Sequence, residues 1–239
     1  MDYSRFTLDE IAVVDKLIAF HKSQKRVTDI GRANILALLA DAPELESLVH
    51  SYRVRLKSED SMRLKLFLKL ARCQDDGSLF DISEANFYKK INDSIGARVI
   101  HLSLTQFPPI HAALRQIFTL GSLIELEPPS AKVFDTSTES FFRRECPDIK
   151  IEINERLYSS VHYVVAPNKH VPWSAEVQVR PIAQEVWGEV DHRFNYPLEN
   201  PDVACREQIK ALAVQMIGTS RTVDAIFRTV EALKERGLQ

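Results

Sequence analysis

The chain has 239 residues, of which 45% are hydrophobic and 27% charged, and its formal net charge is −2 at pH 7. A chain of this length can bury enough apolar surface to fold without disulfides or a structural metal. The near-neutral charge excludes a general electrostatic preference for nucleic acid or anionic membrane, so any anion site must be local. Three distant cysteines match no zinc motif and suit a reducing compartment. With no leader pattern and no apolar run near the ~20 residues of a membrane helix, we expect a cytoplasmic protein.

The apolar pattern divides the chain into three parts. Residues 1–50 are predicted to form two helices, one of which begins with a Thr7–Glu10 capping box. Residues 51–200 alternate short strands with helices, and residues 201–239 are predicted to form one or two amphipathic helices. Strands are expected at 52–57, 96–103, 122–127, 149–153, 160–166 and 175–180, with helices at 59–73 and 107–120. The pattern predicts an α+β (α/β-like) fold: a mixed β-sheet with packed helices, flanked by N- and C-terminal helices.

Positive charge is concentrated in residues 53–72, which carry a net charge of +5. The three basic residues of YRVRLK share one face of a predicted strand, and Ser61, Lys65 and Arg72 share a face of the following helix. The free N–H groups and the dipole at a helix N-terminus add to such charges, so the arrangement suits a polyphosphate. Taken alone, however, a run of this kind is more often a solvated basic face.

Two further patterns could carry chemistry. Asp93 precedes a glycine-containing turn into an apolar strand, where it could hold Mg²⁺, and Arg98 could stack on a base or bind a phosphate. Glu176, Gln178 and Arg180 alternate along a strand and therefore share one face. The alternative for Asp93 and Arg98 is an Asx turn with a surface arginine. The alternative for the polar residues at 176–180 is the half-solvated strand of an ordinary antiparallel sheet.

Aromatic residues and histidines form the last pattern. Tyr158 precedes a strand and can offer its ring to a base, whereas His162 within that strand is expected to be a hydrogen-bonded core histidine. Trp187, His192 and Tyr196 fall at helical spacings, and we expect them to pack against the sheet. No H-x-x-x-H spacing supports a transition-metal site.

These patterns occur in a characteristic order. R-x-K-S-x-x-S-x-x-x-K at 55–65 is followed by D-x-x-G-x-R at 93–98 and Y-x-S-x-H-Y at 158–163, and then by E-x-Q-x-R at 176–180 with W-x-x-x-x-H-x-x-x-Y at 187–196. Over about 51–197 the chain resembles the synthetase domain of the RelA/SpoT alarmone synthetases, as a small single-domain member. The resemblance implies a nucleotidyltransferase-like sheet and a Mg²⁺-dependent GTP/GDP pyrophosphokinase that moves the pyrophosphate of ATP onto the ribose 3′-hydroxyl, giving (p)ppGpp and AMP.

The resemblance also implies roles for individual residues. Two arginines would sandwich the adenine of ATP while two lysines and a serine hold its phosphates; this ATP-binding set is Arg55, Arg98, Lys57, Lys65 and Ser61. Asp93 and Glu176 would hold Mg²⁺, Glu176 would also be the candidate base for the acceptor hydroxyl, and Lys57 and Gln178 would complete the catalytic set. The acceptor-binding set would be Tyr158, whose ring stacks on the base, together with His162, Arg180 and Glu185.

The chain departs from the family pattern on the acceptor side. Leu157 stands where the family has glycine, Pro181 where threonine is usual, and Glu185 where small synthetases often have asparagine. No H-D phosphohydrolase motif occurs upstream, so we expect synthesis without hydrolysis. Small members often assemble through flanking helices, which makes 204–237 the candidate interface of a homo-oligomer.

Two alternatives remain open. A toxin-type pyrophosphokinase would modify the 3′ end of tRNA or an adenine nucleotide; the net charge disfavours tRNA, although the basic run could hold one acceptor end. A catalytically silent nucleotide-binding scaffold would keep the fold alone. The joint presence of Asp93, Glu176 and the basic residues argues against a silent scaffold, because a purely structural role needs none of these charges.

Overall fold

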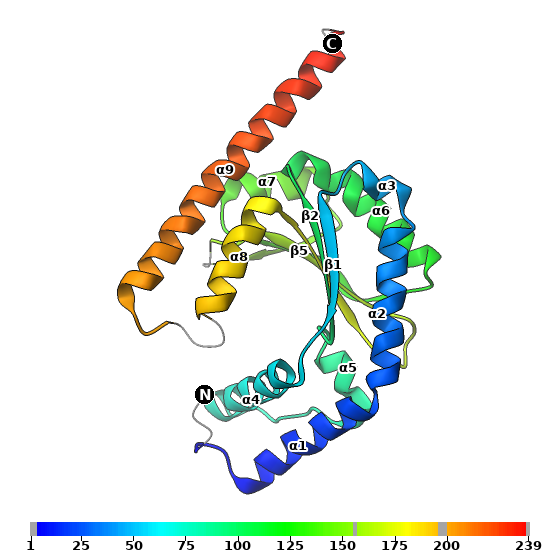
Figure 1. Cartoon of the computed structure of the whole chain (residues 1–239), viewed down its shortest axis with the longest axis vertical. Coiled ribbons are helices and arrows are strands. Elements are labelled where there is room, and N and C mark those ends of the chain that lie inside the picture. The colour runs from blue at the N-terminus through cyan, green and yellow to red at the C-terminus, as the bar shows by residue number, and fades with distance from the viewer. Residues whose placement is uncertain (1–3, 155–156, 196–199, 238–239) are drawn as a thin grey trace.

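The structure is a computed structural model that describes residues 4–154, 157–195 and 200–237 (Figure 1). Within these ranges, six strands form one mixed sheet in the order β1-β2-β6-β5-β3-β4. The β2–β6 and β3–β4 pairs are parallel and the other neighbours are antiparallel, which confirms the predicted α+β class. The strands are β1 (Ser51–Leu56), β2 (Ile95–His101), β3 (Ile124–Val133), β4 (Lys150–Ile153), β5 (Ser160–Ala166) and β6 (Ala175–Pro181).

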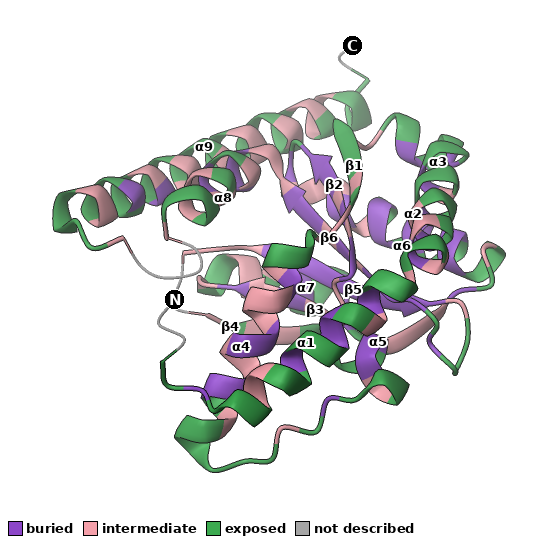
Figure 2. Cartoon of the chain, turned by 60° about the horizontal axis from the view of Figure 1, so that its bottom comes forward, coloured by how far each residue is buried: buried purple, intermediate pink, exposed green. Residues whose placement is uncertain are grey.

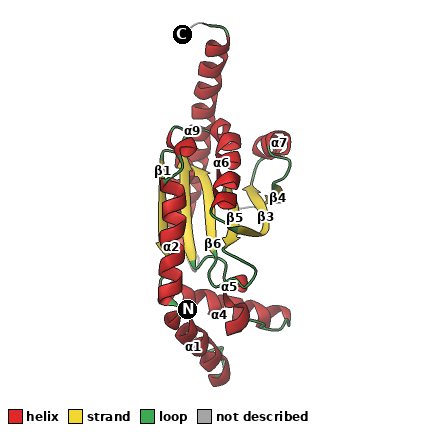
Figure 3. Cartoon of the chain, turned by 90° about the vertical axis from the view of Figure 1, so that its right-hand side faces the viewer, coloured by secondary structure: helices red, strands yellow, loops and turns green. Residues whose placement is uncertain are grey.

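Helices surround the sheet and extend beyond it (Figure 3). They are α1 (Leu8–Ser23), α2 (Lys25–Ala40), α3 (Pro43–Glu46), α4 (Glu59–Asp76), α5 (Phe87–Lys90), α6 (Phe107–Leu120), α7 (Thr136–Glu145), α8 (Ile182–Asn195) and α9 (Val203–Glu235), with the 3₁₀ turns η1 (Glu84–Asn86) and η2 (Leu104–Gln106). Across the described ranges, none of these helices combines the length and apolarity that a bilayer span requires.

Apolar residues on one face of the sheet form the main core. Val99 of β2, Val177 of β6 and Tyr163 of β5 are fully buried beneath Ile35 of α2 and Leu114 of α6. A second apolar cluster joins α1, α4 and α5 at one end of the sheet. Because strand residues alternate between faces, burying this face turns the charged residues of the same strands to the opposite side.

Several elements differ from the sequence-based expectation. Residues 4–50 form three helices instead of the two predicted, because the second helical segment is divided before Pro43 into α2 and the short α3. The strand predicted at 122–127 continues to Val133, and its two prolines lie at register shifts in the pairing with β5, where a missing N–H is tolerated. α5 and α7 were not predicted, and the C-terminal part forms one helix of 33 residues.

The prediction that Trp187 packs against the sheet is wrong. Its ring packs on Ile209 and Ala213, and its indole nitrogen donates a hydrogen bond to the Ile209 carbonyl at 3.2 Å. α9 returns along α8 and covers the side of α8 that carries Trp187 (Figure 1). The helical spacing placed Trp187 on an apolar stripe but could not tell which element covers that stripe. Tyr196, the last member of this motif, lies outside the described residues.

Candidate active site

The face of the sheet opposite the main core carries a row of polar side chains. Arg55 of β1 lies opposite Gly96 of β2, and Gly96 lies opposite Glu176 of β6. On the next strand, His162 of β5 lies opposite Gln178 of β6. The register therefore joins four strands into one continuous polar surface.

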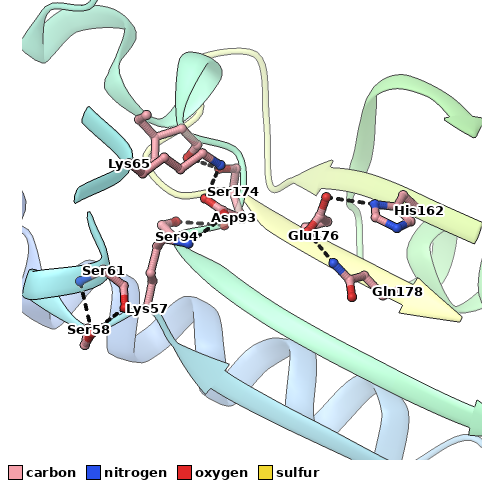
Figure 4. Close-up of polar contacts among 11 residues, drawn as sticks. Lys57, Ser58, Ser61, Lys65, Asp93, Ser94, His162, Ser174, Glu176 and Gln178 are labelled. Carbon is pink, nitrogen blue, oxygen red and sulfur yellow. Dashed lines mark hydrogen bonds and ion pairs between the residues drawn. The ribbon is translucent and has the colours of Figure 1, made fainter. Parts of the chain in front are cut away.

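Two lysines converge on Asp93 where β1 runs into α4. Lys57 Nζ lies 2.8 Å from Asp93 Oδ2, and Lys65 Nζ lies 2.7 Å from Oδ1 (Figure 4). Burial raises the pKa of the Asp93 carboxyl, but the charges of Lys65 and Lys57 outweigh it and hold the pKa below its usual value. With two ammonium groups around one carboxylate, the cluster keeps a net positive charge, which suits a phosphate group.

Two hydrogen bonds fix the backbone on either side of this lysine–aspartate cluster. Ser58 caps α4 by accepting a hydrogen bond from the Ser61 backbone N–H at 3.2 Å, which starts the helix immediately after Lys57. The fully buried Ser94 hydroxyl donates to the Ser174 carbonyl at 2.9 Å and so ties the turn that carries Asp93 to the start of β6. The predicted residue Ser61 therefore lies at the helix N-terminus beside the lysines.

Glu176 is held by two neighbours on the polar face. His162 Nδ1 lies 3.0 Å from Glu176 Oε1, and Gln178 Nε2 donates to Oε2 at 2.8 Å (Figure 4). Burial raises the pKa of Glu176, but the hydrogen bonds from His162 and Gln178 and the charges of His162 and Lys65 outweigh it and lower the pKa to about 2. Glu176 is therefore a carboxylate at neutral pH and a weak base, better suited to binding a cation or orienting a hydroxyl than to removing a proton.

Several of these groups line one cleft, while Ser61, Lys65 and His162 lie outside its lining. The structure thus brings together most of the residues predicted for ATP binding, catalysis and metal binding. Arg53 also lines the cleft; it was counted in the basic run but was not assigned to the site. The full lining is Arg53, Arg55, Lys57, Asp93, Gly96, Ala97, Arg98, Glu176 and Gln178.

Two carboxylates of α8 form ion pairs with Arg98. Arg98 Nη1 lies 2.9 Å from Glu185 Oε1 and also pairs with Glu189. Glu185 pairs in addition with Arg180, whose side chain is only 4% exposed. The sequence analysis missed Glu189, although it follows Glu185 by four residues and therefore lies on the same face of α8. Glu185 bridges the two arginines instead of standing alone on the acceptor side.

Tyr158 and Arg180 form the predicted acceptor side. Arg180 Nη1 donates to the Tyr158 hydroxyl at 3.3 Å, and the guanidinium carbon lies 5.8 Å from the Tyr158 ring centroid. A Cβ at Gly188 would come within 2.9 Å of Arg180 Nη1, so the glycine allows α8 to approach the arginine closely. His162, predicted for the same side, instead contacts Glu176 and has its ring 6.4 Å from that of Tyr158.

The residue before Tyr158 adopts a backbone conformation that favours glycine. Leu157 has φ +27°, and its side chain packs against the cluster around Trp187. A non-glycine residue in the left-handed region costs about 1–2 kcal/mol. The apolar contacts of this half-buried side chain offset part of the strain, which is compatible with a leucine where the family pattern has glycine.

We therefore expect Leu157→Gly to be at least as stable as Leu157→Ala. Both variants lose the buried side chain, but only glycine also relieves the backbone strain. Urea unfolding measures the difference. Leu212 contacts the same cluster from within α9, so the order should be reversed there. We expect Leu212→Gly to be less stable than Leu212→Ala by about 1 kcal/mol. A Leu157→Gly variant clearly less stable than Leu157→Ala would contradict the strain argument.

The donor set fits a magnesium ion. Asp93 and Glu176 line the same cleft, and both have a lowered pKa, so two ionised carboxylates are available. Asp93 Oδ1 is buried without a hydrogen bond, although Lys65 lies within ion-pair distance. Among the residues that the structure describes, no group of three or more His, Cys, Asp or Glu side chains could hold a metal by itself. Mg²⁺ is commonly bound by one or two carboxylates together with substrate phosphates and water.

Comparisons with known proteins give independent information. The family model for the region found in RelA / SpoT proteins matches residues 54–201. A comparison with curated protein sequences found no match. Small alarmone synthetase 1 from Bacillus subtilis has a similar structure, with a TM-score of 0.57 and 13% identity, over 91% of this chain and 99% of that chain.

Two other solved structures are similar. One is the same Bacillus subtilis protein bound to its product pppGpp, with a TM-score of 0.52, 15% identity, and coverage of 87% of this chain and 93% of that chain. The other is a GTP pyrophosphokinase family protein from Streptococcus pneumoniae, with a TM-score of 0.51, 12% identity, and coverage of 91% and 93%. At these identities the likeness shows a shared fold.

Proposed function

This chain belongs to the RelA/SpoT family, and we propose that it is a GTP/GDP pyrophosphokinase. It would transfer the pyrophosphate of ATP to the ribose 3′-hydroxyl of a guanine nucleotide, giving (p)ppGpp and AMP, with Mg²⁺ as cofactor. The observation that carries the proposal is that one cleft holds the Lys57–Asp93 pair and Glu176 beside three arginines. The similar Bacillus subtilis structure bound to pppGpp supports a guanine nucleotide as acceptor.

The geometry suggests how the residues would act. The acceptor hydroxyl oxygen attacks the β-phosphorus of ATP, a new P–O bond forms, the bond to the α-phosphate oxygen breaks to release AMP, and the hydroxyl proton passes to water. Negative charge then builds on phosphoryl oxygens, where Lys57 and Lys65 would stabilise it. Glu176 would accept the hydrogen bond of the acceptor hydroxyl and direct its lone pair at phosphorus. A magnesium ion held by Asp93 and Glu176 would neutralise part of the phosphate charge.

The pairing of Arg98 with α8 is compatible with adenine binding. A guanidinium is planar, and it can pair with carboxylates along its edge while its face stacks on a base. Glu185 and Glu189 would hold the Arg98 plane in a fixed orientation, and Arg55, which is exposed on the neighbouring strand, would close over the other face of the adenine.

The direct test uses purified protein with Mg²⁺ and β-labelled ATP, with GMP, GDP, GTP, ATP and bulk tRNA offered as separate acceptors. We expect AMP release and label on GDP or GTP. Label on tRNA or on an adenine nucleotide would instead establish the toxin-type reaction, and ATP binding without any transfer would establish a silent scaffold.

Unlabelled ppGpp incubated with the protein and Mn²⁺ should lose no pyrophosphate, because we propose synthesis without hydrolysis.

We expect Tyr158→Ala to raise the KM for the acceptor by about 10-fold while the KM for ATP changes little. The variant removes a stacking platform, and stacking of a base on an aromatic ring contributes about 1–3 kcal/mol. Steady-state kinetics with each nucleotide varied in turn measures both constants. Tyr52→Ala, which removes an exposed tyrosine of β1, is the control. A selective loss of ATP affinity would place Tyr158 on the donor side.

We also propose that the protein forms a homo-oligomer through its terminal helices. The outer part of α9 extends beyond the sheet (Figure 1), and its surface there is largely exposed or half-buried (Figure 2). Ile226 on this part is 56% exposed. We expect Ile226→Glu to shift the wild-type oligomer toward monomer in sedimentation velocity, whereas Arg228→Glu, two residues further on and therefore on roughly the opposite side of the helix, should not. A wild-type protein that sediments as a monomer would contradict the proposal.

A further inference from the structure

A second cavity lies between the sheet and α9, apart from the cleft that holds Asp93 and Glu176. It opens where β2 and β6 end and where η2, α7 and α9 meet. Three aromatic rings, Phe107, Phe134 and Phe142, contribute to its walls, and Ile217 closes it from α9. Such walls favour an apolar, planar ligand.

The cavity also holds polar groups that lack partners. The hydroxyl oxygens of Ser159 and Ser220 are buried and have no hydrogen-bond partner within the part of the chain that the structure describes. Buried hydroxyls normally find a partner, because leaving one unpaired costs free energy. A bound molecule with a polar edge would supply that partner.

His101 adds an acceptor to the wall. It is 1% exposed, and burial lowers its pKa to about 4, so the ring is neutral at pH 7. Its Nδ1 lies 2.8 Å from the Ser103 carbonyl oxygen, which can only accept; Nδ1 therefore carries the proton and Nε2 carries the lone pair. A ligand with an O–H or N–H group matches this arrangement.

The charged groups at the mouth of the cavity already have partners. Asp224 accepts hydrogen bonds from the Ser103 hydroxyl and the Leu104 N–H, both at 2.7 Å. Arg221 lies 3.7 Å from Asp135, which caps α7. The lining therefore carries two carboxylates and one arginine, a net charge of −1 that disfavours an anionic ligand, and both carboxylates already accept hydrogen bonds.

A chain of hydrogen bonds leads from this cavity to Glu176. Ser160 lines the cavity, and its hydroxyl lies 2.6 Å from His162 Nε2, while His162 Nδ1 lies 3.0 Å from Glu176 Oε1. A carboxylate only accepts, so His162 Nδ1 donates to Glu176, and the Ser160 hydroxyl is the partner of the other ring nitrogen. Ser160 therefore joins the lining of the cavity to the ring that holds Glu176.

We propose that this cavity binds a small, uncharged aromatic molecule with a hydroxyl or ring N–H group, and that its occupancy acts on Glu176 through Ser160 and His162. The binding is independent of the proposed reaction. The effect on Glu176 rests on the proposed function, because it is measured as a change in the rate of transfer.

Binding is tested with 4-fluorophenol and the full chain by ¹⁹F NMR, without any nucleotide. We expect saturable binding, and about tenfold weaker binding of fluorobenzene, which lacks the hydroxyl and so loses one hydrogen bond. Ile217→Trp fills the cavity and should weaken the binding of 4-fluorophenol at least tenfold. Val214→Trp, at a 60% exposed position of the same helix, is the matched control and should bind as the wild type does.

The absence of saturable binding to the wild type, or an unchanged affinity in a folded Ile217→Trp variant, would overturn the site. If circular dichroism shows that Ile217→Trp does not fold, Ser220→Val is used instead. It exchanges the unpaired hydroxyl for methyl groups, so we expect several-fold weaker binding, and an unchanged affinity would overturn the assignment of that hydroxyl as a partner.

The link to Glu176 has its own readout. Saturating 4-fluorophenol should change the wild-type transfer rate, and the change should be absent in Ile217→Trp or Ser220→Val. An unchanged rate in a protein that binds 4-fluorophenol would overturn the link alone. A protein that binds 4-fluorophenol but transfers no pyrophosphate would refute the proposed function and leave the binding site standing.

Discussion

Glu176→Gln is expected to reduce pyrophosphate transfer by about 10²–10³-fold or more, because losing a group that stabilises or aligns the transition state commonly costs that much. The amide keeps the size of the side chain but loses the charge that would bind Mg²⁺ and that receives the hydrogen bond of His162. AMP release under saturating substrates measures the effect. Glu152→Gln, which removes a carboxylate that pairs with Lys150 on the edge strand β4, is the matched control and should keep full activity.

The Glu176→Gln variant should also differ from the wild type in its stability at low pH, which can be measured without an activity assay. The pKa of Glu176 is about 2 in the folded chain, against an ordinary value of 4.5. Since the folded pKa is the lower one, ionised Glu176 stabilises the fold above about pH 4.5, and this contribution is lost as the pH falls toward 2. The unfolding free energy of Glu176→Gln should therefore decrease less between pH 4.5 and pH 2 than that of the wild type. Identical pH dependence in urea unfolding would contradict the ionised state assigned to Glu176.

Asp93→Asn is expected to separate catalysis from ATP binding. Without the carboxylate, the charges of Lys57 and Lys65 are no longer compensated, so ATP measured without Mg²⁺ should bind at least as tightly as to the wild type. Turnover should nevertheless fall by about 10²–10³-fold, because one of the two candidate magnesium ligands is lost. Calorimetric titration of ATP and initial rates measure the two quantities.

Two controls sharpen this result. Asp81→Asn removes a carboxylate that pairs with Lys90 outside the cleft, so its turnover should stay at the wild-type level. Lys65→Met should show the opposite pattern from Asp93→Asn, with weaker ATP binding, because it removes a cation from the cluster. If Asp93→Asn kept wild-type turnover, its role as a magnesium ligand would be refuted.

The sequence by itself determined the features that depend on local periodicity. Alternation along β1 and β6 placed Arg55 on one strand face and Glu176 with Gln178 on another, and both placements are confirmed. The capping pattern at Thr7 and Glu10 predicted the start of α1 correctly. These features follow from side-chain direction and from orphan N–H groups, which neighbouring residues decide. Motif order then predicted the family that the family model matches.

Only the tertiary structure decided which of these groups meet. Lys57 and Asp93 are 36 residues apart, and Arg98 and Glu189 are 91 apart, so no local pattern could join them. Strand register, the return of α9 along α8 and the close approach allowed by Gly188 bring such groups together. Each of these depends on long-range packing, which places a given helical stripe or strand face against one partner among several that the sequence permits. The cavity beneath α9 arises in the same way, since residues from many separate elements line it.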